Sequence, residues 1–373
     1  MIIHDVGIVG LGAMGSMTAL ELARRGQRVI GFDRFRPPHP FGSSTGRSRI
    51  IREAYFEHPQ YVPLVQRAYV KWAELERDGK LPLLSLTGGL MIGPPEGILV
   101  TGARRSATLH GLPFEMLTAR DLRRRFPVFR ARQNEAGLYE PRAGVLRPEA
   151  AIETALALAA SVGADLRFDQ PVLEWRAAAE AISVLTSTGE YRVRRLVLAG
   201  GAWMAGTLPG VPLGLTVARQ PLFWFEPKGD RALVSPEQMP VFIWEWAAGQ
   251  LFYGFPDQGS GVKVAIHHQG EPADPDTVQR PAGPEEAERL RVIMAELTPA
   301  FNGRLLESAV CLYTNTPDGD FLIDRSPADA RVILASPCSG HGFKFAPALG
   351  EVLADLAMDR SPSLDIRPFR LRR

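Results

Sequence analysis

The stretch Val9-Gly10-Leu-Gly12-Ala-Met-Gly15-Ser16 joins an apolar segment, residues 4–9, to residues 14–25, whose apolar positions have helical spacing. A second apolar segment, residues 28–32, follows and ends in Asp33. In a strand–helix–strand unit of this kind, glycines let the backbone approach a pyrophosphate at the helix N-terminus, and the acid can accept a ribose hydroxyl. The stretch therefore predicts a dinucleotide-binding fold in which Gly10, Gly12, Gly15 and Asp33 contact the cofactor. It does not distinguish FAD from NAD.

The C-terminal part of the chain carries a second set of glycines. Gly340, Gly342 and Lys344 precede a stretch with helical spacing, residues 346–358, and Cys311 lies upstream. The start of such a helix presents free backbone N–H groups and a positive dipole, which suit an anion or a polarised carbonyl. We therefore expect a nucleotide cofactor held by both ends of the chain. The thiol of Cys311 could also attach it covalently, which a nicotinamide dehydrogenase does not need.

Length and composition are those of an ordinary soluble enzyme. A chain of 373 residues predicts two closely packed domains, and 45% hydrophobic with 23% charged residues is typical of a globular protein. The net charge is +2 with scattered basic residues, so nucleic-acid binding is not expected. No apolar run reaches the roughly 18 residues of a membrane span, and no signal peptide is recognisable. We expect a cytoplasmic protein without a disulfide framework or a metal site.

Two lysines stand out because lysine is scarce. The chain has 43 basic residues, and only five of them are lysines. Lys263 and Lys344 are flanked by apolar or small residues, where a charge is costly without a partner. One interpretation is a functional cation and the other a buried structural ion pair. The sequence leaves both open.

Two arginines pose a similar question. Arg49 and Arg52 flank two isoleucines after a Pro- and Gly-rich loop, residues 35–46. Each could be a fixed guanidinium aimed at a cofactor or at a substrate carboxylate. The spacing alone favours the other interpretation, a surface ion pair.

Residues 216–270 change to aromatic-rich segments with a period of two. They predict antiparallel strands at residues 222–225, 241–246, 252–255 and 262–267. In the last strand, Lys263, Ala265 and His267 share one face and could line a pocket. His267 could equally be a core histidine, and His268 is expected to point the opposite way.

The remaining segments predict the domain organisation. Residues 61–76 and an alanine-rich part of residues 145–170 are predicted helices, and the apolar stretch from Leu196 to the glycine pair at 200–201 returns to the first domain. The domains are therefore discontinuous. We expect a cofactor domain formed by residues 1–85, 145–215 and 320–373, and a substrate domain formed by residues 86–144 and 216–319.

These residues resemble the monomeric sarcosine oxidase family, which includes N-methyltryptophan oxidase and pipecolate oxidase, over nearly the whole chain. The motifs that carry the resemblance are Gly10–Gly15 with Asp33, Arg49-Ile-Ile-Arg52 with Ala54-Tyr55, Tyr61-Val-Pro-Leu64, Glu140-Pro141, Gly144-Val-Leu146, Tyr253-Gly-Phe-Pro256, Lys263, His267, Asp274-Pro-Asp-Thr277, Cys311-Leu-Tyr-Thr and Ser339-Gly-His-Gly-Phe-Lys344-Phe. The resemblance implies an α/β fold: a glutathione-reductase-type, Rossmann-like FAD domain and a second domain with a mainly antiparallel sheet.

The resemblance also implies the cofactor. In this family FAD is joined through its 8-methyl carbon to a cysteine that matches Cys311, and Val172, Gly342, Phe343 and Lys344 would contact it. The chemistry agrees, because a thiolate is the nucleophile for that electrophilic carbon. Cys338, which is nearer the glycine motif in sequence, is the less favoured attachment point.

The site residues implied by the resemblance surround a small amino acid. Arg52 and Lys344 would bind the substrate carboxylate, Tyr313, Tyr253 and His267 would line the cavity, Lys263 would assist the reaction with oxygen, and Arg49 would lie on the opposite side of the flavin. The implied reaction oxidises the N–CH bond of a secondary amino acid and produces hydrogen peroxide. The expected partners are that substrate and O2, with the protein as a monomer.

Some positions depart from the family pattern. Ile243 stands where sarcosine-specific enzymes tend to have methionine, and Thr45 where histidine is common, so sarcosine itself is in doubt as the substrate. The main alternative is a non-covalent FAD amine oxidase or dehydrogenase of the glycine or D-amino acid oxidase type. A non-catalytic flavin-binding module is a third possibility, and a nicotinamide dehydrogenase is the least favoured.

Overall fold

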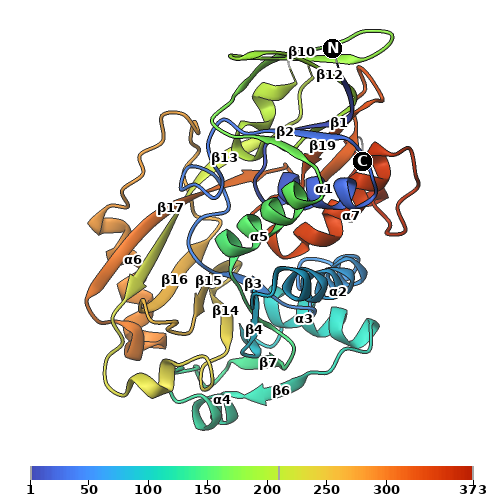
Figure 1. Ribbon diagram of the computed structural model, residues 1–373. Coiled ribbons are helices and arrows are strands. Elements are labelled where there is room, and N and C mark those ends of the chain that lie inside the picture. The colour runs from blue at the N-terminus through green and yellow to red at the C-terminus, as the bar shows by residue number, and fades with distance from the viewer. Residues whose placement is uncertain (1, 209–210, 372–373) are drawn as a thin grey trace.

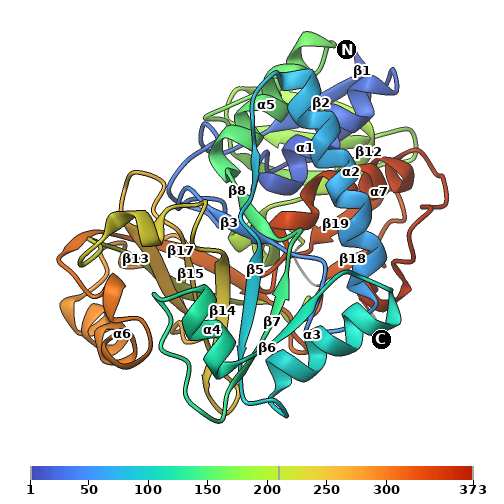
Figure 2. The same cartoon turned by 90° about the horizontal axis from the view of Figure 1, so that it is seen from below.

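The computed structural model describes residues 2–208 and 211–371, and within these ranges the chain forms two eight-stranded sheets and one three-stranded sheet. The first large sheet lies at the top of Figure 1, with the helices α1, α5 and α7 beneath it. The second lies below and to the left, and the chain passes between the two sheets several times (Figures 1 and 2).

The first sheet contains the predicted dinucleotide-binding unit. Strand β1 pairs in parallel with β12 on one side and with β2 on the other, and β12 pairs in parallel with β19. Its helices are α1, α2, α5 and α7, and α1 packs against both α5 and α7. The bounds are β1 Ile3–Val9, α1 Ala13–Arg24, β2 Val29–Phe32, α2 Tyr61–Gly79, α5 Pro148–Ser161, β9 Asp165–Arg167, β10 Val172–Ala177, β11 Ile182–Thr186, β12 Gly189–Leu198, β18 Leu322–Arg325, β19 Val332–Ser336 and α7 Ala346–Ala357.

Three details in this half refine the predictions. The alanine-rich helix ends at Ser161, because residues 165–167 form the edge strand β9 beside β2. The antiparallel hairpin of β10 and β11 was not predicted from the sequence. The helix α7 begins at Ala346, after one 3₁₀ turn, Phe343–Phe345.

The second sheet has the strand order β17-β13-β16-β15-β14-β5-β7-β6. Neighbouring strands are antiparallel except β14 and β5, which are parallel, so the prediction of a mainly antiparallel sheet is confirmed. A capping box of Thr118 and Asp121 starts α4. The bounds are β5 Gly89–Gly93, α3 Ile98–Leu109, β6 Glu115–Thr118, α4 Ala119–Arg125, β7 Ala136–Glu140, β13 Thr216–Phe225, β14 Val241–Ala247, β15 Gln250–Phe255, β16 Val262–His267, α6 Pro284–Leu297 and β17 Leu305–Asn315.

A small three-stranded sheet lies where the two halves meet. Strand β8, Gly144–Leu146, pairs with β3, Arg49–Ile51, and with β4, Leu84–Leu86. The short 3₁₀ helices are η1 Gly201–Thr207, η2 Arg231–Val234, η3 Pro299–Phe301, η4 Phe343–Phe345 and η5 Arg367–Phe369. Because β3 carries Arg49 and ends just before Arg52, this sheet places both arginines between the halves.

Two cores support the two halves. Around α1, α2 and α7 the largest buried side chains include Trp72 and Phe345, and around the second sheet they include Trp244 and Phe129. The strands of the first sheet come from residues 3–32, 165–198 and 322–336, and those of the second from residues 89–140 and 216–315. The domain boundaries at residues 85, 144, 215 and 319 stay a prediction. In the described part of the chain, no helix combines the length and the apolar character that a membrane crossing requires.

Candidate active site

A cavity between the two sheets receives residues from distant parts of the chain. Its lining begins at Gly10 and Asp33 behind β1 and β2 and ends at Lys344 before α7. Cys311 of β17 and Tyr253 of β15 line it from the second sheet. The two ends of the chain therefore meet in one cavity, as the sequence predicted.

The end of the cavity at β1 is shaped by backbone. Gly10 has φ +89°, and a Cβ on it would lie 2.4 Å from Ala199 O. A Cβ on Gly15 would lie 1.8 Å from Gly10 O, whereas a Cβ on Gly12 would make only an ordinary contact with Ser44 Oγ at 3.9 Å. These glycines allow the tight turn and the close approach of α1 to β1 that a pyrophosphate site needs.

Asp33 closes this end from β2. Its Oδ2 accepts the Leu11 N–H at 2.8 Å and its Oδ1 accepts the Phe35 N–H at 2.9 Å. Burial raises the pKa of the Asp33 carboxyl, and the two N–H donors oppose that rise. Each oxygen keeps a second lone pair, so the carboxyl can also accept a ribose hydroxyl.

The middle of the cavity has the polar groups of a site built for a large ligand. Ser43 Oγ and Thr314 Oγ1 are buried and have no hydrogen-bond partner among the described residues, and both residues line the cavity. Buried polar groups without a partner are costly, so a ligand that bonds to them is favoured. Val172, Gly342 and Phe343 line the same space. The residues present therefore fit FAD.

Cys311 faces this cavity from β17. Its Sγ lies 3.5 Å from Arg49 Nη2 and 3.3 Å from Ser43 O. Cys338 lines the cavity too, but desolvation raises the pKa of its thiol to about 11, which keeps it protonated. Cys311 is thus in contact with a guanidinium, whereas the Cys338 thiol stays protonated.

Arg49 and Lys263 are anchored to the loop before β3. Arg49 donates to the carbonyl oxygens of Ser43, Thr45 and Ser48. Lys263 is 2% exposed, and its Nζ donates to Gly46 O at 2.7 Å and to the carbonyl and hydroxyl oxygens of Ser48, both at 3.1 Å. Burial, then the charge of Arg49, lowers the pKa of Lys263 well below its usual value. These oxygens, rather than a carboxylate, hold the lysine.

Arg52 is 2% exposed, so the surface ion pair favoured from its spacing is wrong. It forms an inward ion pair with Glu57, with Nη2 2.7 and 2.6 Å from the two carboxylate oxygens. Burial alone would raise the pKa of the Glu57 carboxyl, but the charges of Arg52 and then Lys344 hold it below its usual value. The prediction from the spacing was wrong because β3 lies between the two halves of the protein. The neighbouring residues in the sequence do not show that Arg52 is buried there.

Lys344 is 6% exposed and lies beside Arg52. Its Nζ donates to His341 O at 2.7 Å and to the Tyr55 hydroxyl at 3.4 Å. Burial, then the charge of Arg52, lowers the pKa of Lys344 to about 7. Two cations thus line one side of the cavity, and an anionic group bound between them would offset their repulsion.

The aromatic wall of the cavity comes from β15, β16 and β17. His267 Nδ1 lies 3.3 Å from the Tyr313 hydroxyl, and Tyr253 lies against the His267 ring. Burial lowers the pKa of His267 well below its usual value, so the ring is neutral. Lys263 and Ala265 share a side of β16, as predicted. Both are buried there, Ala265 with Trp224 and Cys311, and Lys263 with its Nζ 5.5 Å from the Trp224 ring centroid.

The expectation that His268 points the opposite way is wrong. Strand β16 ends at His267, and His268 has φ +55°. Its ring lies 4.1 Å from the His267 ring and 5.3 Å from that of Tyr313. The two-residue alternation of side chains holds only as long as the strand continues, and here the backbone turns back.

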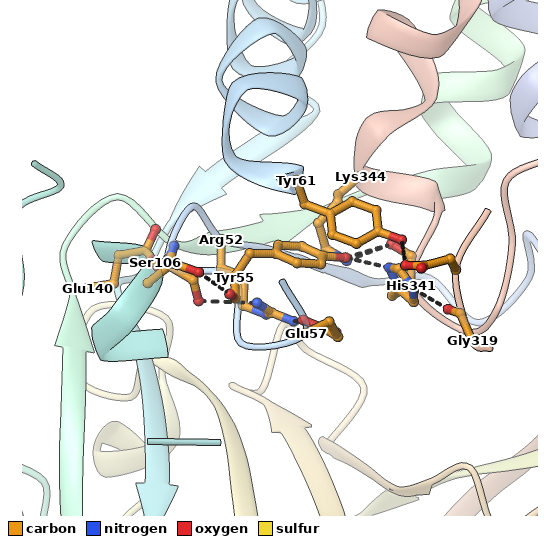
Figure 3. A network of polar contacts seen from close by, with 11 residues as sticks. Arg52, Tyr55, Glu57, Tyr61, Ser106, Glu140, Gly319, His341 and Lys344 are labelled. Carbon is orange, nitrogen blue, oxygen red and sulfur yellow. Dashed lines mark hydrogen bonds and ion pairs between the residues drawn. The ribbon is translucent and has the colours of Figure 1, made fainter. Parts of the chain in front are cut away.

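Four polar residues beside the cavity were given no role from the sequence. Figure 3 shows Tyr55, Glu57, Glu140 and His341 in one network with Arg52 and Lys344. Glu140 accepts the N–H groups of residues 53 and 54 at 2.6 and 2.9 Å, and burial raises the pKa of its carboxyl to about 7. Tyr55, Glu140 and His341 belong to sequence motifs named above, and these motifs could have indicated a role in the site. Glu57 belongs to none of these motifs.

Comparisons with known proteins agree with this geometry. The family described as FAD dependent oxidoreductase matches residues 5–356. A monomeric sarcosine oxidase of Streptomyces avermitilis is 41% identical to this chain. The alignment covers 99% of this chain and 97% of that oxidase. An N-methyl-L-tryptophan oxidase of Salmonella heidelberg is 34% identical and covers 99% of both chains. The open form of NikD, described as an unusual amino acid oxidase, has the same fold, with a TM-score of 0.86 at 24% identity over 99% of this chain and 98% of that one. This chain belongs to the monomeric sarcosine oxidase and N-methyltryptophan oxidase family of FAD-dependent oxidoreductases.

Proposed function

We propose that this protein oxidises the N–CH bond of a small secondary amino acid, N-methylated or cyclic, using FAD attached to Cys311 and O2 as the electron acceptor. The observation that carries the proposal is the pair of buried cations, Arg52 and Lys344, beside a cavity whose other end fits a dinucleotide. The names of the two similar oxidases, which act on sarcosine and N-methyl-L-tryptophan, support the same substrate class.

The two cations would bind the substrate carboxylate. Charge-assisted hydrogen bonds from Arg52 and Lys344 in a water-poor cavity orient the substrate as well as bind it. The ion pair with Glu57 occupies Arg52 Nη2, so a bound carboxylate would share or replace that contact. The amine would then face the aromatic wall of the cavity.

That wall does not need to supply a general base. His267 is neutral. Burial, then nearby Tyr253, raises the pKa of the Tyr313 hydroxyl well above its usual value, and the charge of Arg49 only opposes this rise, so the hydroxyl stays protonated. The substrate would bind with its amine already unprotonated. Tyr253, His267 and Tyr313 would then position the N–CH group and exclude water. Ile243 also lines this cavity and would contact the substituent that distinguishes one secondary amino acid from another.

FAD, when bound, supplies a hydride acceptor for the carbon next to nitrogen and passes the electrons to O2 to give hydrogen peroxide. Lys263 would act in the oxygen reaction. A cation fixed by Gly46 and Ser48 needs little reorganisation to stabilise the negative charge that develops as oxygen is reduced. Arg49, at the start of β3, lies beside Lys263 and Cys311 and would contact the cofactor there.

The covalent bond is tested by denaturing the yellow holoprotein in acid. Colour that stays with the pellet, and that leaves it in Cys311→Ala but not in Cys338→Ala, supports the attachment at Cys311. Colour in the supernatant of the unchanged protein would favour the alternative, a non-covalent FAD amine oxidase of the glycine or D-amino acid oxidase type.

The substrate is tested by anaerobic bleaching of the flavin. Sarcosine, N-methyl-L-tryptophan, pipecolate and proline should be compared with the matching primary amino acids, and the secondary amines should bleach the flavin faster. A flavin that stays yellow with every amino acid would instead indicate a non-catalytic flavin-binding protein. We also propose that the protein is a cytoplasmic monomer, which light scattering of the purified chain tests for its oligomeric part.

A further inference from the structure

Tyr55 lies between the two cations that we propose for the substrate carboxylate. It is fully buried, with Arg52 Cζ 4.1 Å from its ring centroid and Lys344 Nζ 5.3 Å from it. Its hydroxyl oxygen is 3.4 Å from Lys344 Nζ (Figure 3). One side chain therefore contacts both cations, which come from opposite ends of the chain.

The direction of the hydrogen bonds around Tyr55 follows from His341. His341 Nε2 lies 3.1 Å from Gly319 O, and a carbonyl oxygen only accepts, so Nε2 carries the ring proton. Burial lowers the pKa of His341 to about 4, so the ring is neutral and Nδ1 carries no proton. The Tyr55 hydroxyl, 2.5 Å from Nδ1, must then be the donor in that bond.

This direction leaves the Tyr55 oxygen as an acceptor for Lys344. Burial raises the pKa of Tyr55 well above its usual value, so the phenol keeps its proton for His341. The same histidine accepts from Lys344 through its main-chain oxygen at 2.7 Å. Lys344 is thus held by two oxygens whose positions both depend on His341.

The backbone at Tyr55 is also fixed by residues of α3 and β7. Ser106 Oγ of α3 donates to Tyr55 O at 2.5 Å, and Glu140 of β7 accepts the Ala54 N–H at 2.9 Å. Aromatic contacts with Tyr61 and Phe345 hold the ring. A rigid ring and a hydroxyl of fixed direction can hold the flexible Lys344 side chain in one rotamer before the substrate arrives. The entropy cost of fixing that rotamer then does not weaken substrate binding.

We propose that Tyr55 is a positioning residue for substrate binding: its hydroxyl, directed by His341, holds Lys344, and its ring supports Arg52, so that both cations are ready for one carboxylate. The proposal rests on the proposed function. It adds a residue that touches neither the reacting atoms nor the cofactor, and its effect should pass through Lys344.

The test uses Tyr55→Phe, which removes only the hydroxyl and keeps the ring. The holoprotein is titrated with methoxyacetate, in which oxygen replaces the amine of sarcosine, and binding is followed by the change in flavin absorbance. We expect the dissociation constant to rise about tenfold, the lower range for losing a hydrogen bond to a charged group. The KM of the amino acid substrate should rise similarly, with little change in kcat or in the rate of reoxidation by O2.

Two comparisons separate positioning from general disturbance. In a Lys344→Ala background, Tyr55→Phe should weaken methoxyacetate binding by less than about twofold, because its effect acts through the lysine. Tyr69→Phe is the matched control, since it also removes a buried tyrosine hydroxyl, which donates to Arg142 O away from Lys344. That variant should leave methoxyacetate binding unchanged.

Several outcomes would overturn the proposal. Unchanged methoxyacetate binding in Tyr55→Phe would do so, as would a loss that adds fully to that of Lys344→Ala. A fall in FAD content or in kcat equal to the loss of binding would show a structural role instead. Wild-type protein that binds methoxyacetate but oxidises no secondary amino acid would overturn the proposed function alone, and the binding experiments would still test Tyr55.

Discussion

The two ends of the cavity are built from different materials. At the β1 end, backbone groups of Gly10, Gly12 and Gly15 form the site, and Asp33 is held by two main-chain N–H groups. At the other end, the side chains of Arg52 and Lys344 form it, brought together from opposite parts of the chain. Backbone geometry follows from a local motif, whereas converging side chains require the whole fold. The first end should therefore be sensitive to added bulk and the second to lost charge.

The largest effect is expected from bulk at the backbone end. In Gly15→Ala the new Cβ would lie 1.8 Å from Gly10 O, so the turn must move and the protein should retain almost no FAD. The flavin-to-protein absorbance ratio measures this. Gly283→Ala is the control, because its nearest neighbour would be the Glu286 carboxylate at 3.7 Å, and it should bind FAD normally. Normal FAD content in Gly15→Ala would contradict the idea that the β1 end of the cavity is the one sensitive to added bulk.

A large effect on one half-reaction is expected from Lys263→Met. Removing a fixed cation where charge develops typically costs about 10²-fold or more, so reoxidation of the reduced protein by O2 should slow by that order. Anaerobic reduction by substrate should change far less, and stopped-flow absorbance resolves the two steps. Equal slowing of both would assign Lys263 to the general shape of the site rather than to the oxygen reaction.

Loss of charge at the carboxylate end should raise KM. In Lys344→Ala we expect an increase of roughly 10- to 150-fold, the range for one hydrogen bond to a charged group. The kcat at saturating substrate and the FAD content should stay close to those of the unchanged protein. Steady-state oxygen consumption measures this, and a KM within twofold of the original would place the carboxylate elsewhere in the cavity.

A smaller, graded effect is expected from pH. Burial and the charge of Arg52 lower the pKa of Lys344 to about 7, and only the protonated lysine attracts a carboxylate. Methoxyacetate has no amine to titrate, so its affinity should be constant below pH 7. Above pH 7 it should fall by about tenfold per pH unit, until the pKa of Lys344 in the complex is reached. In Lys344→Gln this dependence should disappear, and a persistent slope would identify another titrating group.

The same contrast explains which predictions succeeded. The β1–α1–β2 unit and the aromatic strands β14, β15 and β16 were predicted well, because hydrophobic periodicity and glycine spacing are local signals. The strand predicted at residues 222–225 was found only in part, since β13 begins at Thr216. The hairpin of β10 and β11 was missed. The residues of β10 are mostly exposed, so no apolar period marked that strand. His268 was placed on the wrong side because the strand ended one residue earlier.

The sequence by itself determined the fold class, the dinucleotide motif and the family resemblance, since each rests on residues close together in the chain or on whole motifs. It also identified Lys263 and Lys344 as unusual, because a charge among apolar neighbours is costly wherever it lies. Only the tertiary structure decided how those charges are held. In the fold, Arg52 is buried in an ion pair with Glu57, and Lys263 donates hydrogen bonds to three oxygens. The Tyr55 hydroxyl contacts His341 and Lys344, which lie 286 and 289 residues away in the sequence. Such contacts depend on packing between distant segments, which no local pattern records.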